Sequence, residues 1–141
     1  MLVYYLDITA ERCFTKKGRI VLIEIDPNQP QPLFEQVVMQ VKFAIAAGTV
    51  RANEMIPSVR LLAKQLAVNP NTVVRAFRLL QEEEILVPRR GIGLVVAENC
   101  QDKCLYQRKD FFKQRLNAFI ADATRSGLSK DEIASLLTSN S

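Results

Sequence analysis

Three polar side chains in the middle of the chain carry the hydrogen-bonding groups that pair with nucleic-acid bases. They are Asn71, Thr72 and Arg75. Asparagine pairs through two hydrogen bonds with adenine and arginine does so with guanine, while threonine offers a hydroxyl to phosphate or a methyl to thymine. The first turns of a helix are the part that presents side chains to base edges in the major groove. This set is therefore chemically competent to read duplex DNA, and it leaves the operator sequence open.

Further arginines stand on both sides of this set. Arg60 precedes it, and Arg89 and Arg90 follow it beside Gly91, where the backbone can turn tightly. Arginine is suited to phosphate contacts and to the minor groove. Any one of these arginines, taken alone, is as readily explained as a solvated surface residue. Only their joint placement favours a surface that faces phosphate.

The composition argues against catalysis. The 141 residues include no histidine, which removes the usual general base near neutral pH. We find no glycine-rich phosphate loop and no nucleophile elbow. Cys100 and Cys104 could share a helix face, but two thiolates do not complete a zinc shell. We predict no enzyme, catalytic residue, metal or cofactor, and interpret the cysteines as a buried pair; an enzyme that uses them is the least supported hypothesis.

The charge and hydropathy of the chain bear on its partners and on where in the cell it is found. The net charge of +4 fits a polyanionic partner, although many proteins without such a partner are as basic. No run of apolar residues approaches the roughly eighteen that a membrane span needs, and the first residues lack the pattern of a signal peptide. We expect a cytoplasmic protein with no membrane partner.

Apolar spacing and capping residues predict three helices in the centre of the chain. The first covers 33–47, between Pro32 and Gly48, and the second begins at Pro57-Ser58 and ends near Leu66. The third follows almost at once, because Asn69 is suited to cap a helix and the next residue is a proline. Its predicted buried stripe is Val73, Ala76, Phe77 and Leu80. Two helices joined by so short a turn form a helix-turn-helix.

Two short apolar runs after the third helix predict a β-hairpin. They cover 85–87 and 94–96, and the six residues between them are basic and glycine-bearing. This hairpin would form the wing of a winged helix-turn-helix domain over 25–98. Residues 1–24 are an N-terminal extension of uncertain structure, in which the turn 16–19 suits a hairpin but the flanking runs show no clean alternation.

The segment 99–141 predicts a helical tail. An amphipathic helix ends near Gly127, and Ser129 with Glu132 forms a capping box that opens a last short helix. The apolar face of the longer helix consists of Phe111, Phe112, Leu116, Phe119 and Ile120. This face either mediates dimerisation or packs on the helix at 33–47 of the same chain. We expect dimerisation.

Four motifs resemble those of the GntR family of bacterial regulators. They are Pro32-Leu33-Phe34-Glu35-Gln36, Ile56-Pro57-Ser58-Val59-Arg60-Leu61-Leu62-Ala63, Val68-Asn69-Pro70-Asn71-Thr72-Val73 and Arg89-Arg90-Gly91-Ile92-Gly93. The resemblance covers about half the chain, and the short tail is similar to that of the YtrA-type subfamily. It implies that Arg60, the third helix and the wing residues contact DNA, and that the tail dimerises.

The chain also departs from the family pattern at three places. Ala52-Asn53 stands where the family usually has Pro-Gly, and Glu84 stands where a glycine usually closes the recognition helix, which forces strain or a different cap. In the wing, Ile92 and Leu94 replace a basic residue and a small hydroxyl residue. Residues 1–20 lie outside the resemblance and are an extension, an added strand or an upstream translated segment; the sequence does not choose among these.

Together these patterns predict an α+β, mainly α fold: a winged helix-turn-helix followed by a small helical dimerisation tail. We expect a sequence-specific DNA-binding transcription regulator, a repressor that acts as a homodimer on a two-fold operator. The predicted DNA-binding residues are Arg60, Asn69, Asn71, Thr72, Arg75, Arg89, Arg90 and Gly91. The alternative is a winged-helix module that binds a protein. A small-molecule effector of unknown identity is compatible with the sequence, as is its absence.

Overall fold

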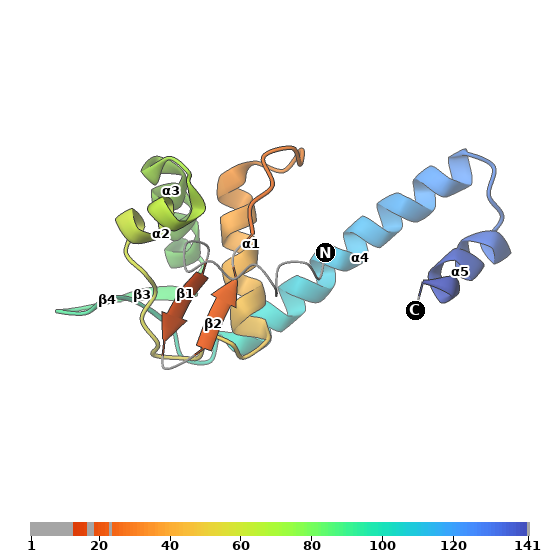
Figure 1. The fold of residues 1–141 in the computed structure, drawn as a ribbon. Coiled ribbons are helices and arrows are strands. Elements are labelled where there is room, and N and C mark those ends of the chain that lie inside the picture. Colours follow the sequence, from red (N-terminus) through yellow and green to blue (C-terminus); the bar gives the residue numbers. More distant parts are fainter. Residues whose placement is uncertain (1–12, 17–18, 23, 141) are drawn as a thin grey trace. The chain divides into compact units, whose positions relative to one another are not determined.

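A computed structural model describes residues 13–16, 19–22 and 24–140 of the chain. These described residues form two compact units, which divide between Tyr106 and Gln107. The elements, shown in Figure 1, are β1 (Cys13–Lys16), β2 (Arg19–Leu22), α1 (Leu33–Ala46), α2 (Val59–Leu66), α3 (Pro70–Glu82), β3 (Leu86–Arg89), β4 (Gly93–Val96), α4 (Gln101–Arg125) and α5 (Lys130–Ser139). Helices dominate and the strands form two small antiparallel sheets. The predicted fold class is confirmed.

The central helices begin and end where their capping residues predict. The Ser58 side chain accepts a hydrogen bond from the Leu61 N–H at the start of α2, and the Asn69 side chain accepts one from the Asn71 N–H at the start of α3. Each bond satisfies a backbone donor that has no partner within its helix. Pro70 occupies the first position of α3, where a missing N–H costs nothing. Capping therefore confines the turn between α2 and α3 to a few residues.

The core of the first unit lies between α1 and α3, with α2 packed against α3. The stripe predicted for α3 is confirmed, because all four of its apolar side chains are at most 3% exposed. The core also takes in Val37 and Val41 from α1 and Leu62 from α2. Burying a side chain of this size contributes about 1.5–3 kcal/mol each. This packing fixes the direction in which α3 presents its opposite, polar face.

The wing strands lie nearer the tip of the hairpin than the sequence indicated. The predicted strands 85–87 and 94–96 are observed as Leu86–Arg89 and Gly93–Val96, and Pro88 pairs with Leu94. A proline is tolerated here because β3 is an edge strand, so the side that lacks an N–H can face away from the ladder. Figure 1 shows that the hairpin extends away from α1, α2 and α3. The paired part of the wing is therefore longer than predicted, and the turn at its tip is shorter.

A segment predicted only as a connector joins the wing to the rest of the domain. The Ile56 N–H donates to the Leu94 carbonyl at 2.9 Å, the Asn53 N–H donates to the Val96 carbonyl at 2.8 Å, and the Val96 N–H donates to the Glu54 carbonyl at 3.0 Å. These bonds lie on the side of β4 that β3 leaves free. Because this segment leads directly into α2, they fix the base of the wing relative to that helix.

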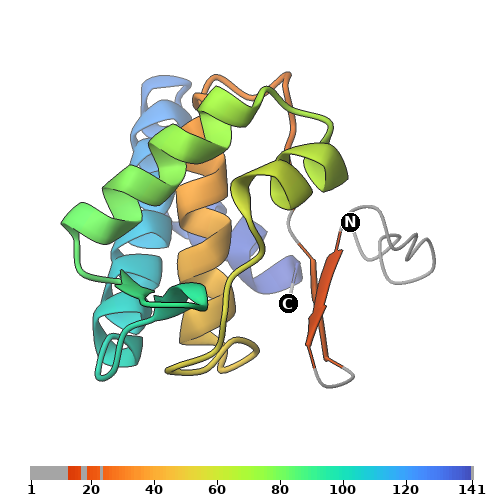
Figure 2. The same cartoon turned by 90° about the vertical axis from the view of Figure 1, so that its left-hand side faces the viewer.

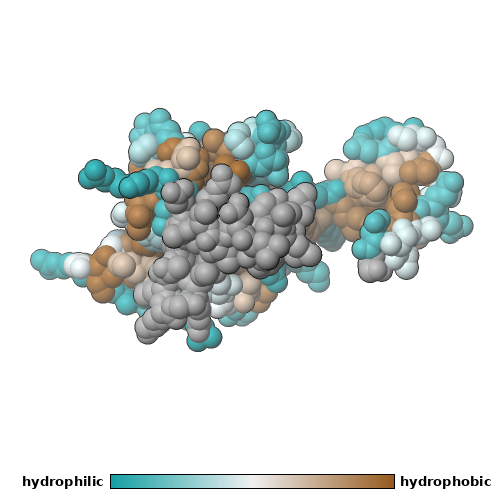
Figure 3. Space-filling model, in the orientation of Figure 1, coloured by the Kyte–Doolittle hydropathy of each residue, from teal (hydrophilic) through white to brown (hydrophobic). Residues whose placement is uncertain are grey.

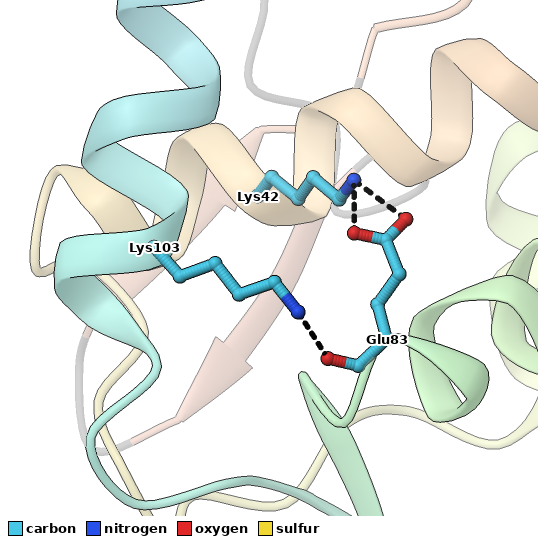
Figure 4. A network of polar contacts seen from close by, with 3 residues as sticks. All are labelled: Lys42, Glu83 and Lys103. Atoms are coloured by element: carbon cyan, nitrogen blue, oxygen red, sulfur yellow. Dashed lines mark hydrogen bonds and ion pairs between the residues drawn. The ribbon is translucent and has the colours of Figure 1, made fainter.

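A network of polar contacts holds the C-terminal end of α3 (Figure 4). The Nζ of Lys42 on α1 donates to both carboxylate oxygens of Glu83 at 2.9 Å, and the Nζ of Lys103 on α4 donates to the main-chain oxygen of Glu83 at 2.6 Å. The side chain of Lys42 is 7% exposed and that of Glu83 is 33% exposed. Glu83, the C-cap of α3, is therefore bonded to residues of both α1 and α4.

The N-terminal segment contains the hairpin that the sequence suggested. Strand β1 pairs with β2 in antiparallel register, from Cys13 opposite Leu22 to Lys16 opposite Arg19. The predicted turn residues 17 and 18 lie outside the described residues. After β2, the Gln36 side chain ties the proline-rich segment to α1 through hydrogen bonds with the backbone of Asp26 and Gln31. The predicted domain limits stay a prediction.

The C-terminal unit contains most of α4, from Gln107 onward, and all of α5. The predicted capping box is confirmed, because the Ser129 side chain accepts from the Glu132 N–H while the Glu132 carboxylate accepts from the Ser129 N–H. These hydrogen bonds lower the pKa of Glu132. Ala123 and Ile133 are buried. The capping box begins α5 directly after the turn, and within that turn the Leu128 N–H donates to the Ala123 carbonyl at 3.1 Å.

Candidate nucleic-acid interface

The polar side chains at the start of α3 point away from its buried stripe. Asn71 and Arg75 are exposed and Thr72 is half-buried, while Val73 beside them is fully buried. The N-terminal turn of a helix combines free N–H groups with the positive end of the helix dipole. Asn69 is exposed as well, but its Oδ1 is committed to the Asn71 N–H at 2.8 Å. Its observed role is that of the cap, and a DNA contact by Asn69 stays a prediction.

Arg75 makes a contact that its spacing did not reveal. Its guanidinium carbon lies 3.6 Å from the centroid of the Phe34 ring, at the start of α1. Phe34 is half-buried and packs against the core of the domain. It is therefore both a core residue and the support of a predicted DNA-binding residue. Helical spacing could not have shown this, since the two residues belong to different helices.

Helix α2 leads into α3 through a tight turn, as Figure 2 shows. Ala67 adopts the left-handed conformation with a φ of 54°, and the Val68 N–H donates to the Ala63 carbonyl at 3.1 Å. This closes α2 in the manner of a Schellman motif without the usual glycine. Arg60 lies in the first turn of α2 and is exposed. The turn keeps the two helices close, as a helix-turn-helix requires.

The three wing residues predicted to bind DNA are all exposed. The guanidinium of Arg89 donates to the Asn53 side chain, whose Nδ2 in turn donates to a Glu98 carboxylate oxygen at 3.1 Å. Arg89 is thus held to the base of the wing, whereas Arg90 stands in the turn between β3 and β4. Gly91 has a φ of +77° and no atom lies within 4 Å of where a Cβ would be. Backbone conformation, and not space, requires glycine there.

Asn53 was noted in the sequence only as a departure from the family pattern. Its φ of 66° shows why a glycine usually occupies this position, and asparagine is the residue that best tolerates the left-handed region after glycine. Its side chain then supplies a partner for Arg89 that glycine could not provide. Asparagine at position 53 therefore supports the wing in this chain through its hydrogen bond with Arg89.

An apolar groove of about 400 Å³ separates the start of α2 from the wing. Met55, Leu61 and Ile92 line it and are between 44% and 52% exposed. The first turn of α2, which carries Arg60, and the residues near the wing tip both line this groove. Ile92 therefore adds apolar surface beside the cationic residues, consistent with the departure noted in the wing sequence.

The cysteine pair is buried, as predicted. Cys100 is 6% exposed and Cys104 is fully buried, and both thiols are free. Burial raises the pKa of Cys100, and it raises that of Cys104 to about 12. A thiol needs a lowered pKa to act as a nucleophile near neutral pH. Among the described residues, no group of three His, Cys, Asp or Glu side chains is placed to hold a metal ion.

Comparison with known proteins identifies the family. The model of the bacterial regulatory proteins of the gntR family matches residues 33–96. The HTH-type transcriptional repressor YtrA of Bacillus subtilis is 32% identical over 79% of this chain and 86% of its own length. The chain belongs to the GntR family. Membership places it among regulatory proteins and not among enzymes.

Solved structures of GntR-family members share the fold. A GntR family transcriptional regulator from Listeria monocytogenes is 32% identical, with a TM-score of 0.66 over 79% of this chain and 97% of that one. YtrA from Sulfolobus acidocaldarius, a GntR-family transcription factor, is 30% identical with a TM-score of 0.52 over 82% of this chain and 93% of that one. These similarities agree with the YtrA-type subfamily predicted from the short tail.

No helix in the described parts of this GntR-family chain is both long and apolar enough to cross a lipid bilayer.

Proposed function

We propose that this GntR-family protein is a sequence-specific DNA-binding transcription regulator that inserts α3 into the major groove. The observation that carries the proposal is the exposed set Asn71, Thr72 and Arg75 at the start of a helix that follows α2 after a tight turn. The buried stripe on the opposite face orients this set outward. Asparagine and arginine then reach adenine and guanine edges.

The remaining predicted residues have positioning roles in this proposal. Arg60 in the first turn of α2 binds the sugar-phosphate backbone, as the first helix of a helix-turn-helix crosses it. Arg90 and Gly91 at the wing tip reach an adjacent phosphate or the minor groove. Arg89, held by Asn53, supplies charge at the base of the wing. Such contacts set the register of the protein on the duplex and add affinity without reading sequence.

We also propose that the protein acts as a homodimer on a two-fold operator. One recognition helix offers few base contacts, and two related half-sites double them. The C-terminal unit supports this, because Phe112, Leu116 and Phe119 are 40–52% exposed on α4, and Figure 3 shows apolar surface on that unit. The Bacillus subtilis relative is named a repressor, so we propose repression, in the cytoplasm where the operator lies.

Binding of the purified protein to its own promoter fragment and to a scrambled duplex, at two salt concentrations, tests this function. We expect the promoter to bind about a thousandfold more tightly, and Arg75→Ala to remove most of that preference. Lys113→Ala is the matched control, since it removes the same charge from an exposed residue of α4. Equal and weak binding to both duplexes that vanishes with salt would contradict the proposal and favour a protein-binding module.

A further inference from the structure

We infer that Phe34 is a positioning residue for Arg75, because its ring supports the guanidinium 3.6 Å away and holds it ready for base contact. This inference rests on the proposed function, in which Arg75 reads a base. The two residues lie on different helices, Phe34 at the second position of α1 and Arg75 at the sixth of α3. The contact therefore joins the start of α1 to the proposed recognition helix, α3.

The guanidinium carbon of Arg75 lies at van der Waals distance from the Phe34 centroid, 3.6 Å, which favours contact through the face of the guanidinium. The five N–H donors of a guanidinium lie in its plane and point outward from its edge, whereas a cation–π contact uses only its face. In the described part of the chain, Arg75 forms no ion pair. The charge and the in-plane donors thus remain available to a base or a phosphate while the ring restricts the side chain.

Phe34 is itself held in place. It is half-buried and packs against the core. The turn in front of it is tied to α1 by Gln36, whose Nε2 donates to the carbonyls of Asp26 at 2.9 Å and Gln31 at 2.8 Å, and whose Oε1 accepts from the Asp26 N–H at 2.9 Å. Gln36 is 5% exposed, so these bonds are protected from water. A ring held in this way by the core and by the turn before α1 can restrict the rotamers of the Arg75 side chain.

If the Phe34 ring restricts the Arg75 side chain before DNA binds, the affinity for DNA should be higher. A free arginine loses rotamer freedom when it binds, and this loss weakens affinity about twofold to tenfold per side chain. A side chain already held by a ring avoids part of that loss. Phe34→Leu keeps an apolar side chain of similar reach but removes the π face, so it isolates the support from the core packing. Phe34→Tyr keeps the face and is the matched rescue variant.

A double-mutant cycle on DNA binding tests the inference. We expect Phe34→Leu to weaken binding to the promoter fragment about threefold to tenfold, Phe34→Tyr to bind as the wild type does, and neither to change binding to the scrambled duplex. In an Arg75→Ala background, Phe34→Leu should cause no further loss. A loss of equal size with and without Arg75 would show a purely structural role, and tighter binding by Phe34→Leu would show that the ring sequesters Arg75; either result overturns the inference.

An NMR measurement without DNA separates this inference from the proposed function. Ring current from Phe34 should shift the Arg75 Hδ resonances upfield in the wild type and in Phe34→Tyr, and the shift should disappear in Phe34→Leu. Random-coil Hδ positions in the wild type would overturn the inference even if the promoter binds specifically. If the upfield shift is present but Arg75→Ala leaves promoter preference intact, base reading by Arg75 fails, and the positioning role of Phe34 for that contact fails with it.

Discussion

The Nζ of Lys42 lies 2.9 Å from each carboxylate oxygen of Glu83, and this ion pair joins α1 to the C-cap residue of α3. Lys42 is nearly inaccessible to water, whereas Glu83 is one-third exposed. A buried cation is stabilised only if its charge is matched and its donors are bonded. The pair therefore ties the recognition helix to the core at its C-terminal end, opposite the end that carries the polar set.

Removing one partner of this pair should destabilise the domain more than removing both. We expect Glu83→Gln to lower the free energy of unfolding by about 2 kcal/mol, less than for a fully buried pair because Glu83 is partly exposed. The double variant Lys42→Met with Glu83→Gln should recover much of that loss, since it leaves no unmatched charge. Urea unfolding followed by circular dichroism measures the wild type, Lys42→Met, Glu83→Gln and the double variant, four proteins in all. Additive losses in the double variant would show that the pair is not coupled.

Glu84 carries strain that a glycine would relieve. Its φ is 58°, and the N–H of the next residue, Ile85, donates to the Leu80 carbonyl at 2.8 Å, as in a Schellman motif. A residue with a Cβ pays about 1–2 kcal/mol in this region. We expect Glu84→Gly to raise the free energy of unfolding by about 1 kcal/mol, after the added entropy of the unfolded chain is subtracted.

The matched control for Glu84→Gly is Glu82→Gly, which removes the same charge from the last residue of α3. There glycine weakens a helix and should lower the melting temperature. Thermal unfolding by differential scanning calorimetry compares the two. Destabilisation by both variants would mean that Glu84 makes a favourable contact larger than its backbone strain.

Local patterns along the chain predicted most of the helices and their ends. The caps Ser58 and Asn69, the stripe on α3 and the capping box at Ser129 depend on residues within a few positions of one another, and all are confirmed. The wing strands reach nearer the tip than predicted, because Pro88 lies within β3. Proline is excluded from central strands but is tolerated in an edge strand.

Contacts between distant segments were the part that the sequence could not provide. The bonds of Asn53 and Ile56 to β4, the Lys42–Glu83 pair and the Phe34–Arg75 contact each join residues at least 38 positions apart. No periodicity encodes such pairs, because tertiary packing decides them. The sequence therefore predicted which side chains are exposed for binding, while the structure was needed to show what supports them.

The arginines outside α3 should contribute charge without sequence preference. We expect Arg60→Ala and Arg90→Ala each to weaken binding to promoter and scrambled duplexes by a similar factor, and to reduce the slope of log affinity against log salt by about one unit. Fluorescence anisotropy across a salt series measures that slope. Lys113→Ala, with the same change of charge, should leave it unchanged. A selective loss on the promoter would assign base reading to the substituted arginine.

The exposed apolar face of α4 should control the oligomeric state. We expect Leu116→Glu with Phe119→Glu to produce a monomer at micromolar concentration, because two charges would have to be buried in the interface. Asn117→Glu, which adds a charge to an exposed residue of the same helix, should leave the mass unchanged. Size exclusion with light scattering reports the mass. A wild-type monomer would contradict the proposed dimer directly.

The buried thiol of Cys104 should make the stability of the domain fall at alkaline pH. Burial raises its pKa from 9.0 to about 12, so the folded state holds this proton more tightly than the unfolded state does. Below pH 9 the thiol is protonated in both the folded and the unfolded state, so its contribution to the free energy of unfolding is at its maximum. Between pH 9 and 12 only the unfolded thiol ionises, and the free energy of unfolding decreases.

Other groups titrate in the same window, so the comparison with Cys104→Ala isolates this thiol. We expect the variant to be less stable than the wild type at pH 7, because a buried side chain is shortened. Its stability should then decline less steeply than that of the wild type between pH 9 and 11, since the ionising group is gone. Urea unfolding at half-unit steps of pH measures both slopes. Parallel slopes would show that Cys104 ionises as readily in the folded domain as in the unfolded chain, and that the burial seen at the start of α4 does not exclude water from its sulfur.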